Sequence, residues 1–319
     1  MGGVGHGHGH GHGHGHGHGH AAGRAEDRRR LKVVLAITAT VLVVELVGAW
    51  LTGSLALLAD AGHMATDAAA VVLALAASYV ASRGGGPRST FGLHRAEILA
   101  ALVNALVLLG VCVYLAYAGV ARLLDGGDSH LEAGPMIGFA AVGLVANLVA
   151  VVVLRGSTSG SLNMRGATNE VLADTLGSVL ALAAGVVAWT TGFDRADPIA
   201  SLLIAVLIAP RSWVLLRDSV AVLLELAPAG LDLDDVRHHL SHVSGVVDVH
   251  DLHAWTITSG IASLSAHVTV TDEALAARGV GPVLDDLGAC LAEHFGVRHA
   301  TFQVEPVSHG AHEDLGEVH

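Results

Sequence analysis

The chain has 319 residues, of which 52% are hydrophobic and only 14% charged, and its mean hydropathy is +0.57. A soluble globular domain carries about 25% charged residues, so this composition indicates a membrane protein. The two cysteines, Cys112 and Cys290, lie far apart, which excludes a disulfide-stapled secreted domain and a CxxC zinc ribbon. Residues 1–218 carry no net formal charge and residues 219–319 carry the whole −12, so the basic surface of a nucleic-acid-binding protein is absent.

Glycine and histidine alternate strictly over residues 5–20. Such a segment has nothing to bury in a core, so residues 1–30 are predicted to form a disordered Gly-His-rich cytoplasmic tail. The alternation is either a native metal-binding tail or an affinity tag. Its eight histidines are candidate ligands of low affinity: His6, His8, His10, His12, His14, His16, His18 and His20.

Six apolar runs follow the tail, each near the roughly 20 residues that cross about 30 Å of hydrocarbon. Short breaks with turn residues, such as Thr52-Gly53-Ser54 and Arg155-Gly156-Ser157, separate them. Residues 31–218 are therefore predicted to form a transmembrane domain of six helices. The runs lie at about 31–52, 55–81, 95–123, 134–154, 166–191 and 197–217.

Positive charge is distributed unequally between the two sides that these spans define. One side holds Arg24, Arg28, Arg29, Arg30, Lys32, Arg83, Arg88, Arg95, Arg155, Arg165, Arg211 and Arg217. The other side holds only Arg122 and Arg195. Because Lys and Arg accumulate in cytoplasmic loops, we expect a multi-pass protein of the cell (inner or plasma) membrane with both termini in the cytoplasm.

After the sixth span, residues 219–307 read as a small cytoplasmic α+β domain. Helical and alternating patterns give the order αββαβ, which is typical of a two-layer domain. Residues 308–319 are predicted to be a disordered tail. The expected elements are helices at 232–243 and 279–295 and strands at 246–258, 262–271 and 299–305.

Ionisable side chains inside the spans are costly, which makes each of them a functional candidate. Asp60, His63 and Asp67 in the second span share one helical face, as do Glu170 and Asp174 in the fifth span. Two helices that each present a pair of ligand-type groups predict a four-coordinate site for a divalent transition metal. The alternative is that these groups only make interhelical hydrogen bonds, the role expected of Asn104 and Asn147.

Several separate segments resemble cation diffusion facilitator transporters, in the same order along about residues 31–307. The first is Ser54-Leu55-Ala56-Leu57-Leu58-Ala59-Asp60-Ala61-Gly62-His63-Met64 with Asp67. The others are Phe91-Gly92 with His94 to Ala101, Val171 to Asp174 with Leu176-Gly177-Ser178, Asp197-Pro198, and Val249 to His253 with Trp255.

The resemblance implies a homodimeric exporter that exchanges cytoplasmic Zn²⁺, or a similar divalent cation, for protons. Its transport site would join an HxxxD pair, His63 and Asp67, with Glu170 and Asp174. In the zinc-type pattern a histidine stands where this chain has Glu170, so Mn²⁺, Fe²⁺ and Co²⁺ also fit as substrates. Asp60 supports this site or its path. Glu45 in the first span has two interpretations, a residue of a proton or cation path and a packed polar partner.

The cytoplasmic domain of that family resembles a small metallochaperone with metal sites near the dimer interface. By position, His250, His267 and Glu305 match its usual ligands, and Gln303 departs where some members have histidine. His253 is a further candidate, although its parity opposes that of His250 unless a bulge intervenes. Zn²⁺ is the expected regulatory ligand, and the alternative is a solvated acidic face. His238, His239 and His242 are expected at a helix surface.

Two other function classes compete with transport. A membrane-anchored metal sensor or storage protein would use the tail and the acidic domain, but it needs no ligands at bilayer depth. An intramembrane metalloprotease would need a motif such as HExxH, which the sequence lacks. We therefore expect a transporter rather than an enzyme, with protons, a divalent cation, the lipid bilayer and a second copy of the chain as partners and no organic cofactor.

Overall fold

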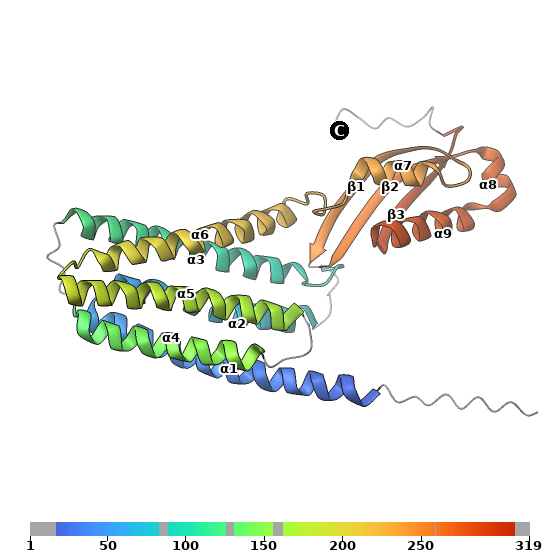
Figure 1. Cartoon of the computed structure of the whole chain (residues 1–319). Helices are drawn as coiled ribbons and strands as arrows, with labels where there is room; N and C mark the ends of the chain where they lie inside the picture. The colour runs from blue at the N-terminus through green and yellow to red at the C-terminus, as the bar shows by residue number, and fades with distance from the viewer. Residues whose placement is uncertain (1–16, 83–88, 126–130, 156–161, 259, 310–319) are drawn as a thin grey trace, which may run out of the picture. The chain divides into compact units, whose positions relative to one another are not determined.

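The computed structural model describes residues 17–82, 89–125, 131–155, 162–258 and 260–309 (Figure 1). Six helices in these ranges are long and apolar enough to cross a membrane, which confirms the predicted spans. They are α1 (Gly17–Thr52), α2 (Leu55–Ser82), α3 (Arg95–Leu124), α4 (Ala133–Arg155), α5 (Leu162–Thr191) and α6 (Ala196–Leu223).

Helix α1 begins at Gly17, inside the segment that was predicted to be disordered through residue 30. Residues 21–30 are mostly alanine, arginine and acidic residues, which are good helix formers with the exception of a glycine and an aspartate. Extending an existing helix costs far less than starting one, so the apolar span propagates backwards through them. His18 and His20 belong to this helix, whereas His6 to His16 and residues 310–319 lie outside the described residues.

The chain divides into two compact units, each of which we describe by itself. The first comprises residues 1–68 and 110–209, and in it α1, α4 and α5 pack against one another (Figure 1). Fully buried alanines such as Ala140, Ala150 and Ala181 allow these helix backbones to approach closely. Large apolar side chains on the outer faces are exposed, among them Trp50 and Trp189 near the ends of α1 and α5. A lipid environment accounts for such exposure, and tryptophan favours the membrane interface.

The second unit, residues 69–109 and 210–319, contains the α+β domain that was predicted. Its elements are α7 (Leu233–Ser241), β1 (Val246–Thr258), β2 (Ile261–Val270), α8 (Asp272–Arg278), α9 (Val280–Cys290), the π-helical turn η1 (Leu291–Phe295) and β3 (His299–Pro306). The described strands form a sheet in the order β1-β2-β3, with β1 and β2 antiparallel and β2 and β3 parallel. Sequence analysis missed α8, whose seven residues are too few for a periodic signal.

One face of this sheet forms the core of the domain. Val249, Leu264 and Val268 pack with Leu240 of α7 and Leu287 of α9, and all five are buried. Successive residues of a strand point to opposite faces, so His250, next to Val249, and His267, next to Val268, lie on the face away from this core. The fold thus places two histidines on adjacent strands of the face that the helices leave uncovered.

Candidate metal sites

The four residues predicted to bind metal in the membrane converge in the first unit. His63 and Asp67 lie one turn apart on α2, and Glu170 and Asp174 lie one turn apart on α5. Donor atoms of His63, Asp67 and Glu170 all lie within 4.8 Å of one another. His63 Nε2 is 3.4 Å from Asp67 Oδ2 and 3.9 Å from Asp174 Oδ1. The helical spacing in the sequence therefore translates into one compact donor group.

The burial of this group makes the negative charge of its carboxylates costly. His63 is 4% exposed and Asp174 is 2% exposed, while Asp67 and Glu170 are partly buried. Three carboxylates close together in an apolar helix layer repel one another, and each loses much of its hydration. Bound cations or protons remove both penalties. The arrangement is therefore suited to hold one or the other in turn.

Helix α2 carries two of the four proposed ligands, and hydrogen bonds to Asp197 of α6 hold its N-terminus in place. Ser54 Oγ donates to Asp197 Oδ1 at 2.5 Å, and the backbone amides of Leu55 and Ala56 donate to the same carboxylate at 2.8 and 3.1 Å. Arg122 balances the charge, with Nη1 3.6 Å from Asp197 Oδ2. Sequence analysis recognised Asp197 only as part of a family motif. The structure gives it a physical role, which is to cap α2 and fix its position.

Glu45 and Asp60 form a second buried polar cluster with Ser178 of α5 and Asn147 of α4. Ser178 Oγ lies 3.1 Å from Asp60 Oδ2 and 3.5 Å from Glu45 Oε1, and Asn147 Nδ2 donates to Ser178 Oγ at 3.2 Å. Glu45 is fully buried and Asp60 is 1% exposed. Neither belongs to the three-donor group that the described residues form around His63. The structure thus brings the two carboxyl groups together beside that group, on α1 and α2.

Two glycines make room for these carboxyl groups, and sequence analysis missed both. A Cβ on Gly143 of α4 would lie 2.5 Å from Glu45 Oε1, and a Cβ on Gly177 of α5 would collide with Asp60 Oδ1. The sequence marked only Gly177, as the residue before Ser178 in the family motif. That Gly177 makes room for Asp60 depends on how α5 packs against α2, which the sequence does not show.

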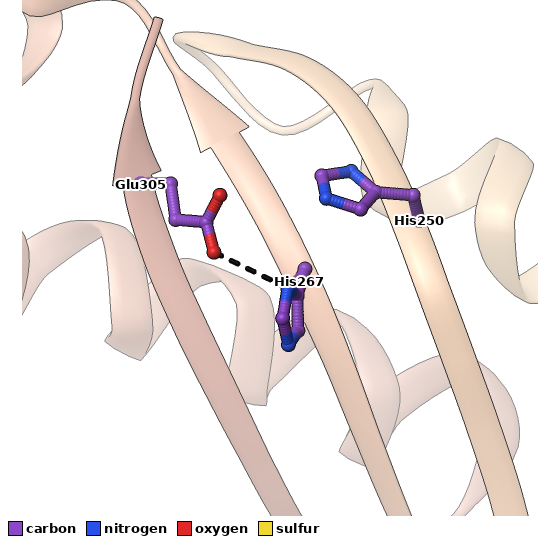
Figure 2. Close-up of side chains that lie close together, drawn as sticks. All are labelled: His250, His267 and Glu305. Carbon is purple, nitrogen blue, oxygen red and sulfur yellow. Dashed lines mark ion pairs between the residues drawn. The ribbon is translucent and has the colours of Figure 1, made fainter. Parts of the chain in front are cut away.

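In the cytoplasmic domain, the structure brings together His250, His267 and Glu305 from β1, β2 and β3 (Figure 2). Their donor atoms lie within 4.8 Å of one another, and His267 Nδ1 is 3.2 Å from Glu305 Oε1. His250 pairs directly with His267 in the β1–β2 register. The three residues that the sequence assigned by position therefore form one group across the sheet.

His253, the fourth candidate, does not join this group. The β1–β2 register shifts between His250 and His253, where Asp251 takes a left-handed conformation with φ of 46°. His253 is exposed, and its Nε2 lies 2.8 Å from Asp251 Oδ1. The other Asp251 oxygen is 3.6 Å from His267 Nε2. A bulge is present between His250 and His253, but it does not bring His253 into the group; Asp251, which was not among the predicted ligands, lies close to His267 instead.

The chemistry of this donor set fits a divalent transition ion. Glu305 is 3% exposed, and its Oε2 is buried without a hydrogen-bond partner among the described residues. Gln303 occupies its other oxygen, with Nε2 donating to Oε1 at 2.6 Å. An unsatisfied buried carboxylate oxygen is costly, and a cation would remove that cost. Two imidazoles and a carboxylate are ligands that Zn²⁺ accepts in proteins.

Comparison with known proteins finds matches over most of the chain. The model of the cation efflux transmembrane domain matches residues 31–224, and that of the cation efflux protein cytoplasmic domain matches residues 228–307. The metal cation efflux system protein CzcD of Cupriavidus metallidurans is 42% identical over 282 residues, 88% of this chain and 87% of that protein. The zinc transporter ZitB of Escherichia coli is 38% identical over 279 residues, 87% of each.

A more distant relative and a solved structure complete the comparison. The cadmium, cobalt and zinc/H(+)-K(+) antiporter of Bacillus subtilis is 35% identical over 270 residues, 84% of this chain and 86% of that protein. The metal-bound C-terminal domain of the CzcD transporter from Cupriavidus metallidurans is 38% identical, with a TM-score of 0.20. It corresponds to 24% of this chain and 99% of its own.

Proposed function

Because the chain belongs to the cation diffusion facilitator family, we propose that it exports a divalent transition-metal cation, with Zn²⁺ as its main substrate and protons as the exchanged ions. One observation carries this proposal. His63, Asp67, Glu170 and Asp174 converge from two membrane helices on a buried position. A sensor or storage protein has no use for ligands at bilayer depth, whereas a carrier requires them.

The charge of the site explains how a dication enters an apolar layer. Moving even a singly charged ion from water to a low-dielectric interior costs about 20 kcal/mol in an idealised treatment. Three carboxylates and one imidazole replace the water lost by the ion and neutralise its charge. Transport then requires that the same ligands release the ion on the far side, so their affinity has to change during the cycle.

Protonation supplies that change. Metal ligands bind only in their deprotonated form, so each proton taken up by the site lowers its affinity for metal. A protonated His63 would form ion pairs with Asp67 at 3.4 Å and Asp174 at 3.9 Å, which replaces the charge of the departing ion. Protons entering from the outside would thus expel the metal, and their loss to the cytoplasm would restore the empty ligands.

Glu45 and Asp60 support this exchange as a path for protons or cations. Both carboxyl groups are buried within reach of Ser178, whose hydroxyl has one proton to donate and so cannot satisfy both at once. Two carboxylates that close together favour holding one proton between them. Asp60 lies one helical turn from His63 on α2, so a proton held here is near the metal ligands.

The ligand set also bears on which metal is carried. Imidazole suits Zn²⁺, whereas carboxylates suit harder ions such as Mn²⁺. With Glu170 in place of a second imidazole, the site retains one nitrogen donor and three carboxylates. We propose Zn²⁺ as the main substrate because His63 lies at the centre of the group. A main substrate among Mn²⁺, Fe²⁺ and Co²⁺ is the second candidate, and Glu170 is the observation that favours it.

We further propose a homodimer in the cell membrane with both termini in the cytoplasm. The match of residues 228–307 to the cytoplasmic domain model supports association through that domain. The distribution of arginine and lysine supports the orientation. In this arrangement His250, His267 and Glu305 face the compartment from which metal is removed. Zn²⁺ bound there would report the cytoplasmic concentration and regulate the transporter.

Reconstituted vesicles test the proposal directly. The full chain is placed in liposomes that contain a zinc-sensitive and a pH-sensitive dye, with an acidic lumen and Zn²⁺ added outside. We expect Zn²⁺ entry and a simultaneous rise in the pH of the lumen, both absent from vesicles with an Asp67→Asn/Asp174→Asn variant. Zn²⁺ entry without any rise in pH would refute proton exchange. Absence of movement for Zn²⁺, Mn²⁺, Fe²⁺ and Co²⁺ alike would refute transport.

A further inference from the structure

Four histidines and one cysteine line a single hollow on the surface of the cytoplasmic domain. The hollow has a volume of about 400 Å³, and α7, α9 and η1, which pack against one another, form its walls. Its ligand-type side chains are His238, His239 and His242 from α7 or its C-terminal cap, Cys290 from the end of α9, and His294 from η1. The sequence analysis assigned the three helix α7 histidines to a surface, and it did not connect them with Cys290 or His294.

The hydrogen bonds of two of these histidines leave the correct nitrogen available for a metal. His239 Nδ1 lies 3.0 Å from the Asp235 carbonyl oxygen, and His242 Nδ1 lies 2.7 Å from the His238 carbonyl oxygen. A carbonyl oxygen only accepts, so Nδ1 carries the proton in both rings and Nε2 keeps its lone pair. Metal-ligating histidines in proteins are held in this way by a hydrogen bond from the second ring nitrogen.

The rings are close enough to share an ion after small rotations. The ring centroids of His238 and His242 are 4.4 Å apart, and those of His239 and His294 are 5.0 Å apart. Their donor atoms do not form one of the three-donor groups within 4.8 Å that the described residues contain. His238, His242 and His294 are exposed, so their side chains are able to turn into the hollow. Exposed side chains change rotamer within nanoseconds, so the barrier to such turning is low.

This hollow is separate from the group formed by His250, His267 and Glu305. That group lies on the uncovered face of the sheet, whereas α7, α9 and η1 cover the opposite face through the core that contains Leu240, Leu287 and Leu291. Its donors also differ in kind. The sheet group combines two imidazoles with a carboxylate, while the hollow offers imidazoles and a sulfur atom and no carboxylate in its lining.

We infer that the hollow between α7, α9 and η1 is a second cytoplasmic metal site, which takes a borderline or soft divalent ion of the Zn²⁺, Co²⁺ and Cd²⁺ class through imidazole Nε2 atoms and the Cys290 sulfur. Imidazole and thiolate ligands select such ions over Mn²⁺ and Mg²⁺, which prefer oxygen. The inference does not depend on the transport proposed above, because this site lies wholly within the cytoplasmic domain.

The Cys290 thiol is mostly protonated until an ion arrives. Its partial burial, together with the nearby Glu293 carboxylate, raises the pKa of the Cys290 thiol above its ordinary value. The thiol is therefore protonated at neutral pH and nucleophilic only in small part. A bound metal displaces this proton and holds the sulfur as thiolate.

Co²⁺ provides a spectroscopic probe that detects a thiolate ligand and does not respond to the other histidines of the chain. Co²⁺ bound to a thiolate gives a charge-transfer absorption in the near ultraviolet that imidazole and carboxylate ligands do not give. The chain has two cysteines, and Cys112 is buried in α3. In the detergent-solubilised full chain we therefore expect a charge-transfer band that persists in Cys112→Ser and disappears in Cys290→Ser. A chain without the band, or a band that survives in Cys290→Ser, would overturn the inference.

Histidine variants and competing metals complete the test. We expect His238→Ala/His242→Ala to raise the Co²⁺ concentration needed for half of the band by about 10-fold or more, and the exposed His309→Ala control to leave it unchanged. Zn²⁺ and Cd²⁺ should remove the band, and Mn²⁺ should not. As a readout independent of any substitution at Cys290, Zn²⁺ should protect Cys290 from alkylation by maleimide in the wild type but not in the double variant. Equal alkylation with and without Zn²⁺ in the wild type would overturn the inference as well.

Discussion

The ligand-type residues on α2 and α5 (the membrane group: His63, Asp67, Glu170 and Asp174) and those on the sheet (the sheet group: His250, His267 and Glu305) are of the same kinds but lie in opposite surroundings. The donors of each lie within 4.8 Å of one another: one histidine and two carboxylates from helices α2 and α5, and two histidines and one carboxylate from strands β1, β2 and β3. In the membrane group the His63 side chain is 5% exposed, whereas those of His250 and His267 in the sheet group are 25% and 20% exposed. Donor chemistry alone therefore does not separate the two groups.

What distinguishes them is the cost of leaving the ligands without an ion. Buried carboxylates without a counter-charge are strongly unfavourable, so the proposed cycle has the membrane group exchange metal for protons instead of standing empty and charged. The partly exposed histidines of the sheet group keep some contact with water, so leaving them without an ion costs less. Substitutions should therefore cost most in the membrane group.

The largest effect is expected at the aspartates of the membrane group. Asp67→Ala and Asp174→Ala each remove one of the four proposed ligands and one of the three negative charges that offset a dication, so transport should fall by about 100-fold or more. The measurement is the initial rate of Zn²⁺ uptake into vesicles. Asp218→Asn, an exposed acid on α6, is the matched control and should transport normally. Normal transport by either ligand variant would contradict the assignment of the site.

A smaller but still large effect should follow from filling the space beside Asp60. A Cβ on Gly177 collides with the Asp60 carboxyl group, so Gly177→Ala should displace Asp60 and lower the rate of Zn²⁺ transport by about 10-fold or more. Gly138→Ala in α4, where a Cβ meets nothing within 4 Å, should leave the rate unchanged. Equal rates for the two variants would show that the position of Asp60 does not matter for transport.

Glu170→His should have a larger effect on the selectivity between metals than on the rate of transport. The substitution restores a second imidazole and leaves two carboxylates, which favours Zn²⁺ over Mn²⁺. We expect the ratio of Zn²⁺ to Mn²⁺ initial rates to rise by about 10-fold or more, because one ligand substitution shifts affinity by that order. The measurement compares Zn²⁺, Mn²⁺, Fe²⁺ and Co²⁺ in the same vesicles. An identical ranking of the four metals in both proteins would show that Glu170 does not touch the ion.

The sequence predicted the membrane helices and the side chains that gather on α2 and α5, because a helix turns spacing into position. Ligands four residues apart on one helix lie on one face whatever the rest of the fold does, so His63 and Asp67, and Glu170 and Asp174, could be paired without a structure. Helical spacing does not tell which residues of one helix lie opposite which residues of another. Gly177 opposite Asp60 and Asp197 capping α2 both depend on contacts between helices distant in sequence.

On the sheet the sequence predicted less, because strand register decides which side chains meet. His250, His267 and Glu305 were assigned by family position alone, not by the alternation of the strands. The bulge at Asp251 could not be located from the pattern, since the parity of His250 and His253 requires a bulge only if both face the same way. The structure has the bulge, yet His253 points away from the group and Asp251 approaches His267.

A moderate effect is expected from His267→Ala in the sheet group. Loss of one ligand should weaken Zn²⁺ binding by the cytoplasmic domain about 10- to 100-fold while the maximal rate of transport stays within a factor of about two. Zn²⁺ binding is measured in a chain that carries Asp174→Ala and Cys290→Ser and lacks residues 1–22, so that the membrane group, the hollow and the tail contribute little. His253→Ala is the matched control, since that exposed histidine lies outside the group. If both variants weaken binding equally, the group does not hold the ion as assigned.

The smallest effect on the transport rate should come from deleting residues 1–22. Glycine-histidine repeats collect metal and raise its local concentration, but they shape no path through the bilayer, so the maximal rate should change by less than about twofold while transport at low free Zn²⁺ becomes slower. A tail of equal length with each histidine replaced by serine separates chelation from length and should behave like the deletion. Complete loss of transport in either variant would place the tail in the transport path, and the contrast between the membrane and cytoplasmic groups would then no longer explain the cycle.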